Sequence, residues 1–174
     1  MLPIHWAAAD GRIDALDYFI SKGQDVNRQD ANGSTPAVIA TQYGQVNTLI
    51  YLYKHGAELT LPDNSGDHVL HWAAYKGNEE ILQLMLYLYP RELHTADRYG
   101  QTALHLGALR GYANIVEILM QKYHADHSLR DKSGKTALEL SIEKRHYHIE
   151  WIIKKRTFKS IFEFYKKVLT EDRK

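Results

Sequence analysis

The 174-residue sequence contains no cysteine. Disulfide bonds and thiolate metal sites are therefore excluded, and a reducing compartment is permitted. An excess of charge of one sign is also lacking, because 22 Lys and Arg residues stand against 21 Asp and Glu residues. Proteins that bind nucleic acid usually carry a strongly basic face, so this balance argues against nucleic acid as a partner.

Long hydrophobic runs are absent as well. No uninterrupted apolar stretch approaches the roughly 18 residues that a membrane-spanning helix needs, although 44% of the residues are hydrophobic. The opening residues, Met1 to Trp6, do not have the basic-then-apolar pattern of a signal peptide. We therefore expect a cytoplasmic domain with enough apolar side chains to build a core.

What the sequence does contain is an internal repeat. A glycine recurs about once every 33 or 34 residues, and each of these glycines follows an aspartate by three positions. The pairs are Asp30 and Gly33, Asp63 and Gly66, Asp97 and Gly100, and Asp131 and Gly134. A second series lies further along each unit and comprises Gly11, Gly44, Gly77 and Gly111, with Arg145 in the last place. Such a period predicts a protein built from stacked supersecondary units.

Each unit contains two predicted helices, separated by a glycine of the second series in all units but the last. The first helix is short and rich in small residues, as in His71-Trp72-Ala73-Ala74. The second carries apolar residues at helical spacing, for example Leu82 and Met85. The glycine between them suits a tight turn with positive φ. The expected N-caps of the first helices are Thr35, Thr102 and Thr136.

The segments Gly33-Ser-Thr-Pro-Ala, Gly100-Gln-Thr-Ala-Leu-His and Gly134-Lys-Thr-Ala-Leu resemble the ankyrin repeat family, over about residues 2 to 155. This resemblance implies an all-α fold, an ankyrin repeat solenoid of helix-turn-helix units with short hairpin loops. We expect repeats over residues 1–156, followed by an amphipathic helix over 157–174. The expected units are about 1–29, 30–62, 63–96, 97–130 and 131–156.

Two departures from the family pattern lead to further expectations. Leu2-Pro3-Ile4-His5 stands where Thr-Pro-Leu-His belongs, without the preceding hairpin, so we expect a piece excised from a longer protein. The additional residue of the 34-residue units falls near Leu86 to Arg91 and at the counterpart near Tyr123. The passage from helix to hairpin should be altered at both places.

The predicted C-terminal helix has one apolar stripe and several lysines off it. The stripe comprises Phe158, Ile161, Phe162, Tyr165, Val168 and Leu169. The helix is expected either to cap the exposed face of the last repeat or to lie near a membrane with its lysines toward anionic lipid. The two roles are compatible.

No catalytic, cofactor-binding or metal-binding residue is expected. His5, His71 and His105 occupy equivalent places, but stacked helices lie roughly 10 Å apart, which is too far for a shared ion. The ankyrin resemblance implies instead that these histidines bond to the backbone of the neighbouring hairpin. Nucleophile and nucleotide-binding motifs are absent from the sequence.

A partner-binding surface is expected instead. Trp6 and Trp72 follow the motif histidine, and each either fills space between repeats or lines a groove. The ankyrin resemblance implies contacts from hairpin tips and first helices, with proteins or extended peptides as partners. The candidates are Trp6, Asp10, Tyr43, Asp67, Trp72, Tyr75, Lys76, Tyr99, Leu109 and Arg110. No core role is expected for Tyr43, Tyr75, Tyr99, Leu109 or Arg110. We expect a monomer that meets a membrane only through a parent protein or the 157–174 helix.

The stretch from His5 to Asp14, with Tyr18-Phe19-Ile20-Ser21-Lys22-Gly23, resembles the ankyrin units of the DHHC protein S-acyltransferases (palmitoyltransferases), as does Trp151-Ile152-Ile153 in the last unit. That resemblance implies a cytosolic module, at the Golgi or another internal membrane, that recruits substrates to a catalytic domain outside this chain. The family's groove has Asn at the place of Asp10 and Trp at the place of Ile39, so neither contact is retained. The alternative is a generic ankyrin scaffold or adaptor not linked to an acyltransferase.

Overall fold

The computed structural model describes residues 1–155, so the helix expected over 157–174 and its alternative roles lie outside the described residues. The described part consists of helices and loops and has no strand. The helices come in pairs along the chain: α1 (Pro3–Ala9) with α2 (Ile13–Ser21), α3 (Pro36–Gln42) with α4 (Val46–Lys54), α5 (Val69–Lys76) with α6 (Glu79–Leu88), α7 (Ala103–Arg110) with α8 (Ala113–Glu117), and α9 (Ala137–Glu143) with a helical segment over 147–155.

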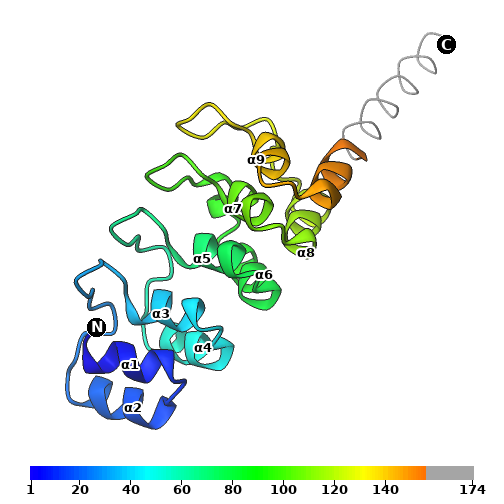
Figure 1. Cartoon of the computed structure of the whole chain (residues 1–174). Coiled ribbons are helices and arrows are strands. Elements are labelled where there is room, and N and C mark those ends of the chain that lie inside the picture. The colour runs from blue at the N-terminus through cyan, green and yellow to red at the C-terminus, as the bar shows by residue number, and fades with distance from the viewer. Residues whose placement is uncertain (156–174) are drawn as a thin grey trace, which may run out of the picture.

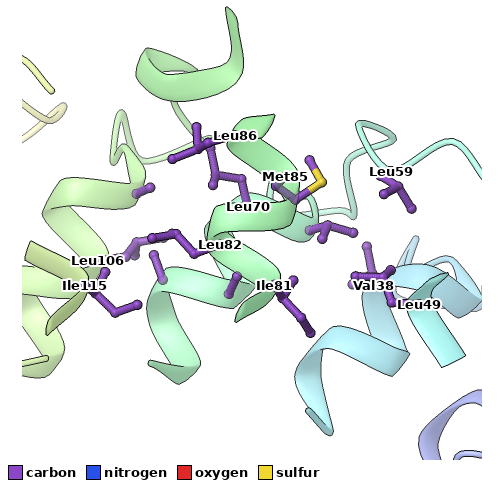
Figure 2. Packing of buried hydrophobic residues seen from close by; sticks show 14 of the residues in the cluster. Val38, Leu49, Leu59, Leu70, Ile81, Leu82, Met85, Leu86, Leu106 and Ile115 are labelled. Atoms are coloured by element: carbon purple, nitrogen blue, oxygen red, sulfur yellow. The ribbon is translucent and has the colours of Figure 1, made fainter. Parts of the chain in front are cut away.

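The pairs stack side by side, and the hairpin loops that join them project on one side of the stack (Figure 1). First helices pack against first helices along the series α1, α3, α5, α7 and α9. The apolar sides of the paired helices meet in one continuous core, where Leu82 lies next to Leu106 of the following unit and Met85 lies on the side of the preceding unit (Figure 2). Each unit therefore buries its apolar residues only with the help of its neighbours.

One carboxylate oxygen organises each hairpin. Oδ1 of Asp63 accepts the N–H groups of Ser65 at 2.8 Å and Asp67 at 3.0 Å. The same two bonds recur at the aspartates of the other three complete hairpins: Asp30, Asp97 and Asp131. These bonds satisfy backbone donors that a tight turn would otherwise leave unpaired.

Successive hairpins are also bonded to each other through the backbone. Asn64 N donates to Asn32 O at 2.9 Å, Arg98 N to Ser65 O at 2.9 Å, and Lys132 N to Tyr99 O at 2.8 Å. Because neighbouring tips are fixed by this regular bond, side chains from adjacent tips hold a constant relation to one another. The tips thus form one edge of a continuous surface.

The predicted caps and turns are confirmed. The three expected threonines are the N-cap residues of α3, α7 and α9, and His68 takes that place in α5. The glycines between paired helices all have positive φ, as at Gly77 with φ 73°. Arg145 adopts the same conformation, with φ 60°, although an L side chain is strained there.

The two altered connections are confirmed as well. A 3₁₀ turn, η1 (Pro90–His94), follows α6. After α8 the helix widens into a π-turn, η2 (Ile118–Lys122), and His124 then has φ 58°. An additional residue can be accommodated by such a local widening without disturbing the stack.

Within residues 1–155, no helix is both long enough and apolar enough to cross a membrane.

Candidate partner-binding groove

Three buried histidines fix the first helices to the hairpins that follow them. Nε2–H donates to a backbone carbonyl in each case: His5 to Ser34 at 2.9 Å, His71 to Thr95 at 3.1 Å and His105 to Leu129 at 3.1 Å. Burial lowers the pKa of all three imidazoles, which favours the neutral form that makes this bond. The role that the ankyrin resemblance implied for them is confirmed, and the hairpin tips are held at a set angle to the first helices.

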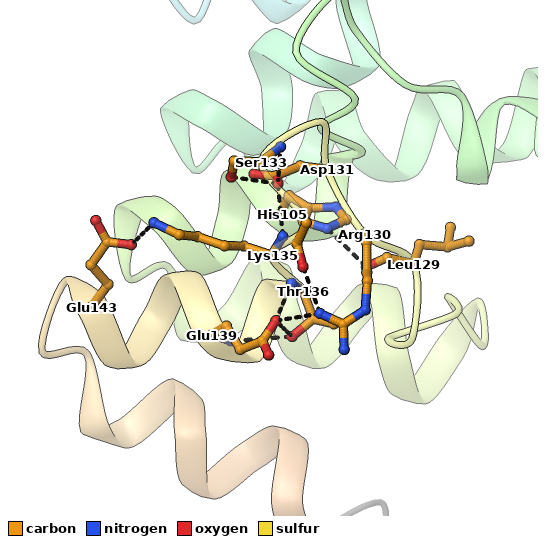
Figure 3. A network of polar contacts seen from close by, with 10 residues as sticks. His105, Leu129, Arg130, Asp131, Ser133, Lys135, Thr136, Glu139 and Glu143 are labelled. Carbon is orange, nitrogen blue, oxygen red and sulfur yellow. Dashed lines mark hydrogen bonds and ion pairs between the residues drawn. The ribbon is translucent and has the colours of Figure 1, made fainter.

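The last hairpin shows how such a unit satisfies its own charges (Figure 3). Arg130 pairs with Glu139 at 3.0 Å, and Lys135 pairs with Glu143. Glu139 in turn accepts the N–H of Thr136 at 2.7 Å. These four charged side chains therefore have partners within the unit.

Two adjoining cavities lie between the hairpin tips and the first helices. The first, of about 380 Å³, is lined by Met1, Asp30, Asn32, Ser34, Ile39, Gln42, Tyr43, Asp63, Asn64, Ser65 and Trp72. The second, of about 220 Å³, is lined by Ser65, Asp67, Trp72, Tyr75, Asp97, Tyr99, Gln101, Leu106 and Leu109. Because Ser65 and Trp72 line both, the two cavities form one interrupted groove, called here the tip groove.

The tip groove brings together six of the ten candidate residues: Tyr43, Asp67, Trp72, Tyr75, Tyr99 and Leu109. Arg110 adjoins them, because its guanidinium carbon lies 4.6 Å from the centroid of the Tyr75 ring. Trp6, Asp10 and Lys76 line neither cavity. Trp6 is 55% exposed, so the two tryptophans of the repeat have different surroundings.

Trp72 combines the two roles that the sequence left open. Its indole Nε1–H donates to Asp63 Oδ2 at 3.0 Å, and its ring meets Tyr75 edge to face with centroids 5.6 Å apart. It packs partly against the core and also forms the wall between the cavities. The expectation that Tyr75 and Leu109 have no core role is wrong, because both pack partly against the core through their apolar atoms.

The sequence missed the aspartates of the groove. In the sequence, Asp63 and Asp97 stood out only as members of the repeat, three positions before a glycine, and their Oδ1 atoms serve the turns there. Both nevertheless line a cavity while only 8% exposed. The overlooked signal is the residue nine positions later, because Trp72 offers a donor to Asp63 whereas Leu106 offers none to Asp97.

Asp67 carries the most unusual electrostatic environment of the groove. Burial, followed by the negative charges of Asp97 and Asp63, raises the pKa of its carboxyl to about 7. The equivalent positions of the other hairpins hold Ser34, Gln101 and Lys135. The negative charge at Asp67 is therefore specific to this unit and is unfavourable in the free chain.

Stacked helix pairs, hairpins bonded tip to tip and a groove between tips and first helices define a repeat solenoid that serves as a binding scaffold. Sequence comparison identifies the kind of repeat. The family model for ankyrin repeats (3 copies) matches residues 4–91 and 70–161. The chain belongs to the ankyrin repeat family, and it is a protein-interaction module.

The chain is also similar to palmitoyltransferases. It is 37% identical over 76 residues to palmitoyltransferase AKR1 of Lachancea kluyveri, which is 43% of this chain and 10% of that protein. It is 41% identical over 64 residues to human palmitoyltransferase ZDHHC17 (36% of this chain, 10% of that protein), and 38% identical over 71 residues to human palmitoyltransferase ZDHHC13 (40% and 11%). The matches thus span about a tenth of each relative. The present 174 residues have no cysteine and so contain no Asp-His-His-Cys stretch.

Proposed function

We propose that this chain is the substrate-recruiting ankyrin domain of a membrane-bound protein S-acyltransferase and that it binds an extended segment of the substrate in the tip groove. The relatives that are similar over up to 43% of this chain bear the name palmitoyltransferase. The observation that carries the binding role is the continuity of the two cavities across Trp72. A groove made of two cavities in a row suits an extended peptide better than a compact small molecule.

Exposed aromatic side chains flank the groove at both cavities. Tyr43 at the first cavity is 56% exposed and Tyr99 at the second is 64% exposed. Tyrosine gives a large contact area at low entropic cost and often dominates the binding energy of an interface. Bound peptide would therefore be held mainly by Tyr43, Tyr99 and the half-buried Trp72.

The binding role is tested with an array of cytosolic segments from S-acylated proteins, probed with the purified chain. Tyr43→Ala and Tyr99→Ala are expected to weaken binding of the selected peptides about tenfold each, with the melting temperature unchanged. Tyr87→Ala is the matched control, because Tyr87 is 80% exposed on α6 and lines neither cavity. Equal binding by the groove variants and the wild type would refute the proposed surface.

The acyltransferase context is tested on the longer gene product. The proposal requires downstream hydrophobic spans and an Asp-His-His-Cys stretch, and it requires that the double variant Tyr43→Ala and Tyr99→Ala reduces S-acylation of the bound partner in cells. Peptide binding without either feature would favour a scaffold or adaptor that is not linked to an acyltransferase.

A further inference from the structure

The second cavity of the tip groove combines aromatic walls with carboxylates. Trp72, Tyr75 and Tyr99 contribute the rings, and Asp67 and Asp97 contribute the charges. The cavity lies at the centre of the stack, between the hairpins of the third and fourth units. A cavity of about 220 Å³ is large enough for one long side chain.

The carboxylates of this cavity have no cationic partner among residues 1–155. The ion pairs of lysine and arginine in that part of the chain involve Asp14, Glu139, Glu143 and Glu150. Glu92 lies 3.4 Å from Nε2 of His68. Asp97 is the more telling case, because its residue exposure is only 8% and its hydrogen bonds, to the N–H groups of Tyr99 and Gln101, all reach Oδ1. None of the described residues donates a hydrogen bond to Oδ2 of Asp97, a residue that lines the cavity. A carboxylate oxygen that has no donor within the chain is free to accept one from a ligand.

The equivalent atom one unit earlier is satisfied from within the chain. Asp63 Oδ2 accepts the indole N–H of Trp72 at 3.0 Å. Leu106 takes the place of Trp72 in the next unit and has no N–H to give. The fourth unit therefore retains an acceptor that the third unit uses internally.

The aromatic wall beside these carboxylates already accommodates a guanidinium group. The Cζ atom of Arg110 lies 4.6 Å from the centroid of Tyr75, whose ring lines the cavity. Arg110 forms no ion pair with Asp67 or Asp97, so within residues 1–155 the negative charge inside the cavity remains uncompensated. Aromatic faces and carboxylates together attract cations more strongly than either does alone.

We propose that the second cavity binds a positively charged side chain of the partner segment, an arginine or a lysine, whose charge lies against Asp67 and Asp97 and whose stem lies against Trp72, Tyr75 and Tyr99. The proposal rests on the groove proposed above as the binding surface, and it adds the chemical class of the residue that the groove selects. The raised pKa of Asp67, which follows from burial and from Asp97 and Asp63, agrees with a site whose positive charge arrives with the partner.

The test uses the three indole N–H signals of the whole chain in two-dimensional NMR, with Trp72→Phe to assign the Trp72 signal. The probe is N-acetyl-arginine amide, and N-acetyl-citrulline amide is its neutral isostere. We expect the arginine probe to shift the Trp72 signal at millimolar concentrations, because a single side chain offers only a few contacts. The citrulline probe should leave the signal in place. A shift with N-acetyl-lysine amide would support the same conclusion.

Two variants separate the cavity from general charge effects. Asp67→Asn keeps the shape of the side chain and should weaken the response to the arginine probe about fivefold. Glu117→Gln removes an exposed negative charge from α8 and should leave the response unchanged. The proposal is overturned by an equal shift with citrulline, by equal shifts of all three indoles, by an unchanged response in Asp67→Asn, or by no shift of Trp72 at all.

Failure of this inference differs from failure of the proposed function. Array peptides without a basic residue could bind through Tyr43 and Tyr99, with Asp67→Asn binding them as well as the wild type. That result would support the tip groove as the binding surface and refute the second cavity as a cation site. If the arginine probe shifts the Trp72 signal but no peptide binds in the array, the second cavity is supported as a cation site and the substrate-recruiting function is refuted.

Discussion

The indole Nε1–H of Trp72 donates a hydrogen bond to Asp63 Oδ2 over 3.0 Å. This bond joins the first helix of the third unit to the turn of its own hairpin, and it fixes the indole as the wall between two cavities. The residue pair is nine positions apart in the sequence, and Leu106 breaks the same pairing with Asp97 one unit later. One bond thus determines which aspartate of the groove is satisfied and which is available to a ligand.

Trp72→Leu, which introduces the residue type found at the equivalent position Leu106, should destabilise the domain. The substitution leaves Asp63 Oδ2 without its donor and removes packing, so urea denaturation should show a loss of about 1–3 kcal/mol. Trp6→Leu is the matched control, because Trp6 has the same repeat position but is 55% exposed. Its effect should stay within about 0.5 kcal/mol. Equal losses in both variants would contradict the structural role given to the Trp72 bond.

Gly66→Ala should be more damaging than Gly134→Ala. Both glycines have φ near 80°, at 83° and 80°. A Cβ at Gly66 would lie 2.8 Å from the backbone N of Arg98, whereas a Cβ at Gly134 meets no described atom within 4 Å. We expect a loss of about 1 kcal/mol at Gly134 from backbone strain alone and of about 3 kcal/mol at Gly66. Equal melting temperatures of the two variants would show that the hairpin contact is unimportant.

Arg145→Gly should stabilise the last unit. Arg145 has φ 60°, while the glycines at equivalent places adopt this conformation without strain. The expected gain is about 1 kcal/mol in the free energy of unfolding. Lys144→Gly serves as the control, since Lys144 has an ordinary φ of −85° and its replacement should bring no gain. A melting temperature of Arg145→Gly at or below that of the wild type would show that the backbone of Arg145 is not strained.

The buried histidines should make the domain sensitive to acid. Burial lowers the pKa of His68 to about 3, with a further contribution from His71. The unfolded chain, with an ordinary value of 6.5, then binds more protons than the folded chain between pH 6.5 and about 3. Stability is therefore retained above pH 6.5 and falls as the pH decreases through this window, by about 2 kcal/mol from His68 alone at about pH 5.

His68→Thr isolates this effect. Threonine is the N-cap of α3, α7 and α9. It removes the buried His68 Nε2, which makes no hydrogen bond and lies 3.4 Å from Oε2 of Glu92. Thermal denaturation as a function of pH should show a flatter acid limb in His68→Thr, while His5, His71 and His105 still contribute to the remaining slope. An identical pH profile in wild type and variant would exclude His68 as a source of acid sensitivity.

Asp67→Asn should increase stability near neutral pH although it weakens the response to a cation. The pKa of Asp67 is raised by burial, so the folded chain binds more protons than the unfolded chain between pH 3.8 and about 7. Asp67 therefore destabilises the fold as the pH rises through this window, opposite in sign to the histidines. We expect a gain of about 1 kcal/mol at about pH 7.5, measured by urea denaturation. Glu117→Gln should be neutral, and a loss of stability in Asp67→Asn would mean that the carboxylate has a stabilising partner.

The repeat determined most of the local structure in advance. The aspartate three positions before each glycine specifies a turn through bonds to its own backbone, and threonine specifies an N-cap for the same local reason. The apolar spacing then predicts two helices per unit. The sequence also indicated where the 34-residue units would deviate, at η1 and η2.

The contents of the groove depend on the stacking of units and could not be read from local pattern. Trp6 and Trp72 have the same register, yet only Trp72 lies between two hairpin tips that close a cavity around it. Tyr75 and Leu109 looked free in the sequence but contact the core from the side of the groove. The distances between tips decide such contacts, and these arise from bonds between units.

The sequence by itself determined the class of fold and the turn chemistry, because these follow from interactions within one or two units. Only the tertiary structure decided that Asp67 and Asp97, from successive hairpins, share one aromatic cavity. The reason is electrostatic as well as geometric: the environment of a carboxylate is set by burial and by charges on neighbouring hairpins, and neither is encoded at the position of the aspartate itself.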